Sequence, residues 1–253
     1  PIHPPDSFEP KTMLNAFTVD VEDYFQVSGF ERDIDRNEWS SYESRVATNV
    51  DRLLDLLERH HVCGTFFVMG WVAENLPDIV RAIDDRGHEI GSHSYWHRLV
   101  YQQTPQDFRE DLRRSRGVLE DLVGRPVTTY RAPSFSITNQ SLWALGILVE
   151  EGFTIDSSVF PTIHDRYGIP GARPDIHEIM TPSGPLCEFP PSVMRLAGVN
   201  LPISGGGYFR LKPWQVTKHC LQHVNRRVKR PFVFYTHPWE IDPEQPRLQA
   251  GSR

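Results

Sequence analysis

Short apolar runs alternate with segments of helical period along most of this chain. Runs suited to buried strands cover residues 14–20, 64–69 and 89–91. Between residues 43 and 61, and again after Thr104-Pro105, apolar residues recur every three or four positions, as on one face of a helix. Because parallel strands need a long crossover connection, strands that alternate with helices predict a mainly parallel sheet covered by helices, which is an α/β fold.

The second half of the chain continues this alternation and places polar residues at strand ends. Further helices are predicted at 73–85, 140–151 and 213–228, and further strands at 127–130, 153–155, 186–189 and 232–235. Five polar residues follow the ends of predicted strands: Asp20, His93, Arg131, Asp156 and His237. A barrel gathers side chains from many strands at its carboxyl rim, so we expect a (β/α) barrel rather than an open sheet. Residues 160–181 are too long for an ordinary connection and are predicted to face a substrate.

The length fits one large α/β domain as well as two small ones, and the composition, that of an ordinary globular protein, does not divide the chain. The 253 residues are 39% hydrophobic and 24% charged, without repeats or long biased runs. We expect a proline-rich arm at 1–12, a catalytic domain at 13–240 and a polar tail at 241–253. A formal net charge of −6 argues against nucleic acid as a partner, and the basic run at 226–230 is interpreted as the solvated end of a helix.

Location follows from what the sequence lacks. No apolar stretch is long enough to span a bilayer, the first residues do not have the pattern of a signal peptide, and the three cysteines form no disulfide framework. These features favour a cytoplasmic protein, or one associated with the cytoplasmic side of a membrane. A periplasmic location is the alternative if a leader has been removed. The sequence leaves the oligomeric state open.

Two histidines four residues apart, His93 and His97, can close on one metal ion. Acids near the end of the first predicted strand can supply a third ligand. Alternation along the strand places Asp20 and Glu22 on one side, and Asp23 can join them if the strand ends in a turn. Two imidazoles and one carboxylate leave positions open for water and substrate, as hydrolytic zinc requires. Chance pairing of histidines and acids in a solvated loop are the alternatives.

Two later residues extend this set. Arg131 follows a strand and precedes Ala132-Pro133, where its guanidinium can hold a catalytic carboxylate through a bidentate pair or form a purely structural salt bridge. His237 ends the strand at 232–235, and an imidazole there can protonate a leaving group because it titrates near neutral pH.

The ordered motifs resemble those of the NodB-type polysaccharide deacetylases, known as carbohydrate esterase family 4. The motifs are Thr18-Val19-Asp20-Val21-Glu22-Asp23, His93-Ser94-Tyr95-Trp96-His97, Arg131-Ala132-Pro133-Ser134-Phe135 and Tyr235-Thr236-His237, with Phe153-Thr154-Ile155-Asp156-Ser157-Ser158 similar to a further motif that carries an aspartate. The resemblance spans about residues 14–240. It implies a distorted (β/α) barrel with about seven parallel strands, in agreement with the alternation above.

The resemblance also implies a site and an activity. Asp20 is the expected base, and Glu22, ahead of Asp23, is the expected carboxylate ligand beside His93 and His97. The metal is a divalent ion, usually Zn²⁺, with Co²⁺, Mn²⁺ or Ni²⁺ as alternatives. Two adjacent aspartates are usual in the first motif, whereas the spaced form here resembles deacetylases of peptidoglycan and of exopolysaccharide loci, and also allantoinase-like amidohydrolases.

An acetylated amino-sugar polymer or oligomer is the partner that the resemblance implies. Four aromatic residues are candidates for stacking on sugar rings, although they could equally belong to the core: Trp96, Phe135, Tyr208 and Trp239. Asp156 is a further candidate for substrate binding. The triple glycine at 205–207 lacks the residues of a phosphate loop and is interpreted as a flexible turn. Besides a deacetylase, the same barrel fits an amidase of small molecules or a carbohydrate-binding protein without catalysis.

Overall fold

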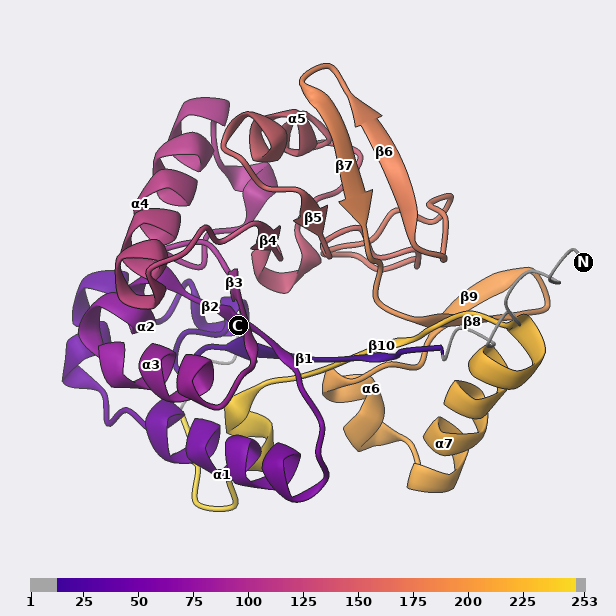
Figure 1. The fold of residues 1–253 in the computed structure, drawn as a ribbon, viewed down its shortest axis with the longest axis horizontal. Coiled ribbons are helices and arrows are strands. Elements are labelled where there is room, and N and C mark those ends of the chain that lie inside the picture. Colours follow the sequence, from indigo (N-terminus) through magenta and orange to yellow (C-terminus); the bar gives the residue numbers. More distant parts are fainter. Residues whose placement is uncertain (1–12, 249–253) are drawn as a thin grey trace, which may run out of the picture.

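The computed structural model describes residues 13–248, so the predicted arm at 1–12 and the end of the predicted tail lie outside the described residues. The main element is a curled sheet of eight strands in the order β10-β1-β2-β3-β4-β5-β7-β6 (Figure 1). The strands are β1 Ala16–Val21, β2 Thr65–Val68, β3 Glu89–Ser92, β4 Thr129–Tyr130, β5 Ile155–Asp156, β6 His177–Thr181, β7 Gly184–Glu188 and β10 Val233–Thr236. The first seven in this order pair in parallel, which confirms a distorted barrel with seven parallel strands.

Helices connect the parallel strands up to β5, and again β7 to β10, and they pack outside the curled sheet (Figure 1). The α-helices are α1 Val46–Arg59, α2 Gly70–Asn75, α3 Pro77–Asp85, α4 Pro105–Val123, α5 Trp143–Glu150, α6 Gly206–Leu211 and α7 Trp214–His223, and a π-helical turn η5 Val224–Val228 extends α7. Short 3₁₀ turns are η1 Ser28–Phe30, η2 Arg36–Ser41, η3 Val100–Gln102, η4 Pro133–Phe135 and η6 Pro238–Ile241. Within residues 13–248 no helix is long and apolar enough to cross a membrane.

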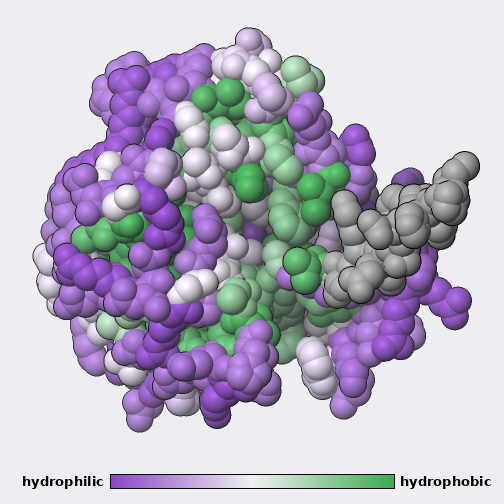
Figure 2. All heavy atoms as spheres, viewed as in Figure 1, coloured by the Kyte–Doolittle hydropathy of each residue, from purple (hydrophilic) through white to green (hydrophobic). Residues whose placement is uncertain are grey.

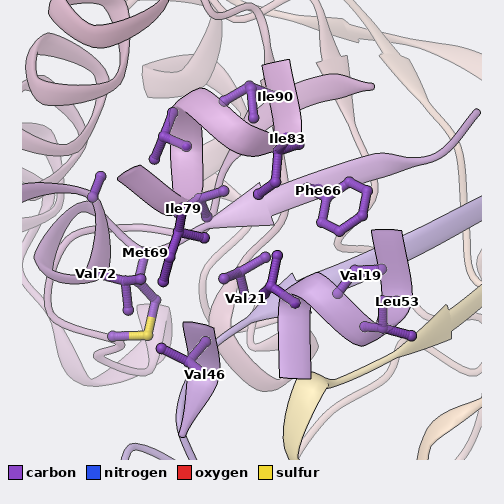
Figure 3. Close-up of a cluster of buried hydrophobic side chains, with 14 of the residues drawn as sticks. Val19, Val21, Val46, Leu53, Phe66, Met69, Val72, Ile79, Ile83 and Ile90 are labelled. Atoms are coloured by element: carbon purple, nitrogen blue, oxygen red, sulfur yellow. The ribbon is translucent and has the colours of Figure 1, made fainter. Parts of the chain in front are cut away.

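A hydrophobic core joins the first strands to their helices. Val19, Val21 and Phe66 on β1 and β2 pack with Leu53 of α1 and Ile83 of α3, and all five side chains are almost fully buried (Figure 3). Burying a side chain of this size contributes about 1.5–3 kcal/mol. The strand β1, which directly precedes Glu22, is therefore fixed by this core.

Local signals explain where several helices start and stop. Thr104 caps α4 through a capping box with Asp107, and Gly124 ends the helix in the left-handed conformation with φ of +67°. The helix predicted at 73–85 is instead two helices, because Pro77 cannot continue the hydrogen bonding of α2 and starts α3.

The long connection at 160–181 and the segment after β7 differ from the prediction. The connection ends in β6, which pairs antiparallel with β7, and β8 Val193–Leu196 forms a hairpin with β9 Val199–Pro202. The triple glycine is not a flexible turn. Gly205 bridges to Tyr235 on β10, and a Cβ atom on Gly205 would lie 1.8 Å from the Tyr235 carbonyl oxygen. Only glycine permits this approach of two backbones.

Candidate metal and acid–base site

Glu22, His93 and His97 come together at the carboxyl ends of β1 and β3. One ligand atom from each lies within 4.8 Å of the other two, and all three residues are buried. Glu22 directly follows β1 and His93 directly follows β3, whereas His97 lies in the loop after β3 with φ of +52°. A non-glycine residue in the left-handed region is uncommon, and here it turns the second imidazole toward the first.

The histidines are oriented by contacts on their outer ring atoms. His93 Nδ1 lies 2.8 Å from the carbonyl oxygen of Arg131, so this nitrogen carries the proton and Nε2 keeps its lone pair. Burial lowers the pKa of His93 to about 4, which keeps the imidazole neutral at physiological pH. His97 Nδ1 lies 3.4 Å from Ser28 Oγ, which also contacts Ser134 Oγ at 2.7 Å.

The carboxylate of Glu22 is held between His97 and Trp239. Glu22 Oε2 lies 2.6 Å from His97 Nε2, and Trp239 Nε1 donates to Oε1 at 3.1 Å. Burial alone raises the pKa of Glu22, but the neighbouring histidines, His97 above all, lower it to about 2. A buried carboxylate held ionised beside two imidazoles is the donor set that suits a divalent metal such as Zn²⁺.

Asp23 lies apart from this set, although it follows Glu22 directly. Its Oδ2 accepts hydrogen bonds from Ser44 Oγ at 2.8 Å and from the backbone N–H groups of Arg45 and Val46 at 2.9 and 3.2 Å. Its Oδ1 accepts from the backbone N–H of Tyr24 at 3.0 Å. Arg45, the residue before α1, has no side-chain cap of its own, so Asp23 caps this helix from outside. Of the two acids considered as ligands, the structure places only Glu22 beside the histidines.

Asp20 and Arg131 form a buried ion pair beside the three residues. Arg131 is fully buried, and its Nη1 donates to Asp20 Oδ1 and to Thr18 Oγ1, both at 2.7 Å. Its Nη2 donates to Ser157 Oγ at 2.8 Å. These bonds leave Asp20 Oδ2 facing His237, whose Nε2 is 3.8 Å away.

His237 lies opposite Asp20 and is itself held by Glu240. Its Nδ1 is 3.3 Å from Glu240 Oε2, and Trp239 stacks on the imidazole with ring centroids 4.8 Å apart. Burial lowers the pKa of His237, but Glu240 and Glu22 outweigh it and raise the pKa to about 9. Arg210 Nε in turn lies 3.1 Å from Glu240 Oε1. At neutral pH this histidine carries a proton.

The candidates for substrate binding are spread over different surroundings. Trp239 contacts Glu22 and His237, and Phe135 packs edge-on against Tyr235 with centroids 5.0 Å apart. Trp96 instead joins an aromatic cluster with Trp39. The hydroxyl of Tyr208 lies 2.7 Å from that of Tyr167 in the long connection.

Asp156 is fully buried and pairs with another buried acid, Glu188. It lies opposite Glu188 in the register of β5 and β7, and Ser158 Oγ donates to its Oδ1 at 2.5 Å. Burial raises the pKa of both carboxyls, that of Glu188 well above its ordinary value. Two adjacent buried carboxyls are stable when they share a proton, because two negative charges side by side would repel each other.

Glu240, Arg210 and Ser28 were not among the predicted site residues. The sequence contains a signal for Glu240, since a proline followed by an acid at the third helical position marks a helix start, as in Pro238-Trp239-Glu240. Arg210 and Ser28 reach the site only through tertiary packing.

Comparison with known proteins agrees with this geometry. Residues 35–148 match the family model "Polysaccharide deacetylase", and residues 157–253 match a model described as a domain of unknown function. The peptidoglycan-N-acetylglucosamine deacetylase of Bacillus cereus is 34% identical over 41% of this chain and 37% of its own length. The peptidoglycan deacetylase of Helicobacter pylori is 34% identical over 44% and 36%. The chain thus spans well under half the length of these two curated relatives.

Solved structures share the fold. A crystal structure from Mycobacterium smegmatis, assigned to the polysaccharide deacetylases, superposes with a TM-score of 0.66 at 24% identity and covers 94% of this chain and 81% of its own. A mutant of a CE4 family pseudoenzyme with restored enzymatic activity superposes with a TM-score of 0.51 at 16% identity over 91% and 58%. The motifs, the curled sheet and the matching family model lead to one conclusion: this chain contains a polysaccharide deacetylase domain of the NodB type, carbohydrate esterase family 4.

Proposed function

We propose that this protein is a metal-dependent hydrolase that removes N-acetyl groups from amino sugars of a bacterial polysaccharide, either an exopolysaccharide or peptidoglycan. The observation that carries the proposal is the convergence of a Glu22–His93–His97 donor set with Asp20 and His237 at one rim of the barrel. The names of the curated relatives support the same reaction class, hydrolysis of the acetamido group.

In this proposal Glu22, His93 and His97 hold a divalent metal, with Zn²⁺ ahead of Co²⁺, Mn²⁺ and Ni²⁺. The donor set fits: His93 presents a free Nε2, and the buried Glu22 Oε2 lies 2.6 Å from His97 Nε2, so the carboxylate and both imidazoles converge on one point. A bound divalent metal polarises an acyl oxygen and acidifies water.

Asp20 and His237 handle the protons on either side of the scissile bond. Asp20 Oδ2 accepts the proton of the attacking water, because Arg131 occupies Oδ1 and fixes the orientation of the carboxylate. His237 then donates its proton to the departing amine, for which its raised pKa suits it. The products are acetate and a free amino sugar.

A polar groove beside the ligands supports a polymeric substrate. A cavity of about 840 Å³ is lined by Ser28, which contacts His97, and extends to Tyr101 and Arg166. Tyr101 and Arg166 also line a second cavity of about 290 Å³ that reaches Tyr167 in the long connection. Together they exceed the room that one small ligand needs and lie on loops at the carboxyl end of the strands, where barrel enzymes bind substrates. Sugars that flank the acetylated unit would occupy this groove.

A direct assay measures bound metal and acetate release on the same preparation. We expect about one metal per chain and acetate from acetylated glucosamine polymers or peptidoglycan. Hydrolysis of allantoin without acetate release from any glycan would replace the proposal with the amidohydrolase alternative, and metal without any hydrolysis would favour a carbohydrate-binding barrel.

Tyr101→Ala tests the groove separately. The variant should lower kcat/KM for long oligomers while leaving single N-acetylglucosamine units unchanged, since only the oligomers reach Tyr101. Equal losses on both substrates would show that the groove does not bind the flanking sugars. We also propose that the protein is located in the cytoplasm or on the cytoplasmic side of a membrane, with the periplasm as the alternative.

A further inference from the structure

One stretch of the chain has a charge opposite to that of the whole protein. Between Glu188 and Glu240 the sequence contains no aspartate or glutamate, although the formal net charge of the chain is −6. The stretch contains eight basic residues: Arg195, Arg210, Lys212, Lys218, Arg226, Arg227, Lys229 and Arg230. It folds as the β8–β9 hairpin, α6, α7, η5 and β10, which form one side of the molecule (Figure 1). This asymmetry points to an anionic partner.

The cations of α7 and η5 are available to such a partner. Lys218 lies on the exposed face of α7, and Arg226, Arg227 and Lys229 follow in and just after η5, all exposed. Within residues 13–248 none of these four forms a salt bridge, whereas arginines elsewhere, such as Arg113 on α4, pair with acids. The basic run lies at the end of a helix, as predicted, because η5 extends α7. This position explains why the run is solvated, but within residues 13–248 no acid pairs with these four cations.

An apolar groove runs beside the same helix. It measures about 590 Å³, and its floor is formed by Phe17 of β1 and Phe234 of β10, between α1 on one side and Trp214 of α7 on the other. Figure 2 shows hydrophobic residues in the hollow between the hydrophilic lobes of this face. Large apolar side chains at its edge are exposed: Leu14 is 79% and Trp214 is 54% accessible.

The groove and the basic run adjoin each other. Asn225 of η5 exchanges side-chain hydrogen bonds with Asn15, at 3.0 and 2.8 Å, and its Nδ2 lies 3.5 Å from Met13 Sδ. Asn15 and Met13 both line the groove. At the other end of α7, Leu211 precedes Trp214 and is 84% accessible. Exposed apolar side chains thus lie at the start of α7 and along the groove, and most of the free cations lie beyond the end of the helix.

We propose that this surface, formed by α7, η5 and the adjoining groove, docks the protein on a bilayer that contains anionic lipids. The absence of acids matches a negatively charged surface, and a Lys or Arg near such a surface favours binding by about fivefold. A soluble polyanion would need the cations but not exposed Leu211, Trp214 and Leu14, which a bilayer interface accommodates. The docking is peripheral and independent of whether the rim site hydrolyses acetamides.

Vesicle flotation with the full chain tests the surface. The protein should bind vesicles of equimolar phosphatidylglycerol and phosphatidylcholine at low salt, bind less at high salt, and fail to bind pure phosphatidylcholine. The double variant Arg226→Gln, Arg227→Gln should weaken binding roughly 20- to 30-fold. Leu211→Ser with Trp214→Ala should weaken it by at least about tenfold.

A matched control removes the same charge elsewhere. Arg81→Gln with Arg113→Gln, on α3 and α4, lowers the net charge equally at exposed positions and should leave vesicle binding unchanged. Acetate release from a small soluble substrate should be equal in all variants if the rim site is active. The proposal is overturned if the protein does not bind anionic vesicles, if the two charge variants weaken binding equally, or if only a soluble polyanion binds.

Discussion

Glu22 and Asp23 are adjacent in sequence, but we expect Glu22 to bind the metal and Asp23 to cap α1. Replacing each acid by its amide in a separate variant should distinguish these two roles. Glu22→Gln removes the anionic donor next to His97 while its amide oxygen can still accept from Trp239. Asp23→Asn keeps one acceptor oxygen but removes the other. We expect Glu22→Gln to lose metal and Asp23→Asn to retain it.

The sizes of the two effects follow from the contacts. Loss of one of three protein ligands should weaken metal binding at least about 100-fold, or about 2.8 kcal/mol. Asp23→Asn leaves at least one of the four donors that bond Asp23 opposite an amide N–H₂ group, and such an unmade hydrogen bond costs about 1–3 kcal/mol. For a chain of this size about 1 kcal/mol lowers Tm by roughly 2–4 °C. We therefore expect a lower Tm by roughly 2–12 °C for the metal-free Asp23 variant.

Metal content per folded chain and thermal unfolding after chelation measure the two effects separately. Circular dichroism confirms that both variants are folded before metal is added back. The assignment fails if Asp23→Asn loses metal while Glu22→Gln keeps it, or if Asp23→Asn unfolds at the same temperature as the unchanged protein.

Two further variants test the acid–base pair and the buried carboxyls. His237→Ala should keep its metal but lose turnover about 10²- to 10⁴-fold, whereas His93→Ala should lose both, and retained metal in the latter would contradict its role as a ligand. Glu188→Gln should flatten the pH dependence of stability: a carboxyl whose pKa is raised on folding stabilises the fold when protonated, and this contribution disappears as pH rises through the folded pKa. Urea unfolding of the metal-free protein above about pH 5 should show a slope shallower by up to about 1.4 kcal/mol per pH unit, and the exposed Glu178→Gln should show no change.

The sequence by itself determined the architecture, because period and polarity are local properties. Apolar runs set the strands, helical spacing set the helices, and residues such as Asp20 and His93 identified the strand ends that meet at one rim. Hairpins were harder to predict: β6, β8 and β9 are short and largely exposed, so burial leaves only a weak pattern in their residues.

Tertiary structure alone decided which neighbouring acid faces the histidines. Glu22 and Asp23 are adjacent in sequence, and the turn after β1 sends one toward His97 and the other toward the start of α1. Tertiary structure also decided the partner of Glu188, because Asp156 lies on another strand. The local sequence shows which side chains have the chemistry to form the site. Which of them form it depends on distances between segments far apart in the chain. Electrostatic and hydrogen-bond energies change over a few ångströms, and only tertiary packing fixes those distances.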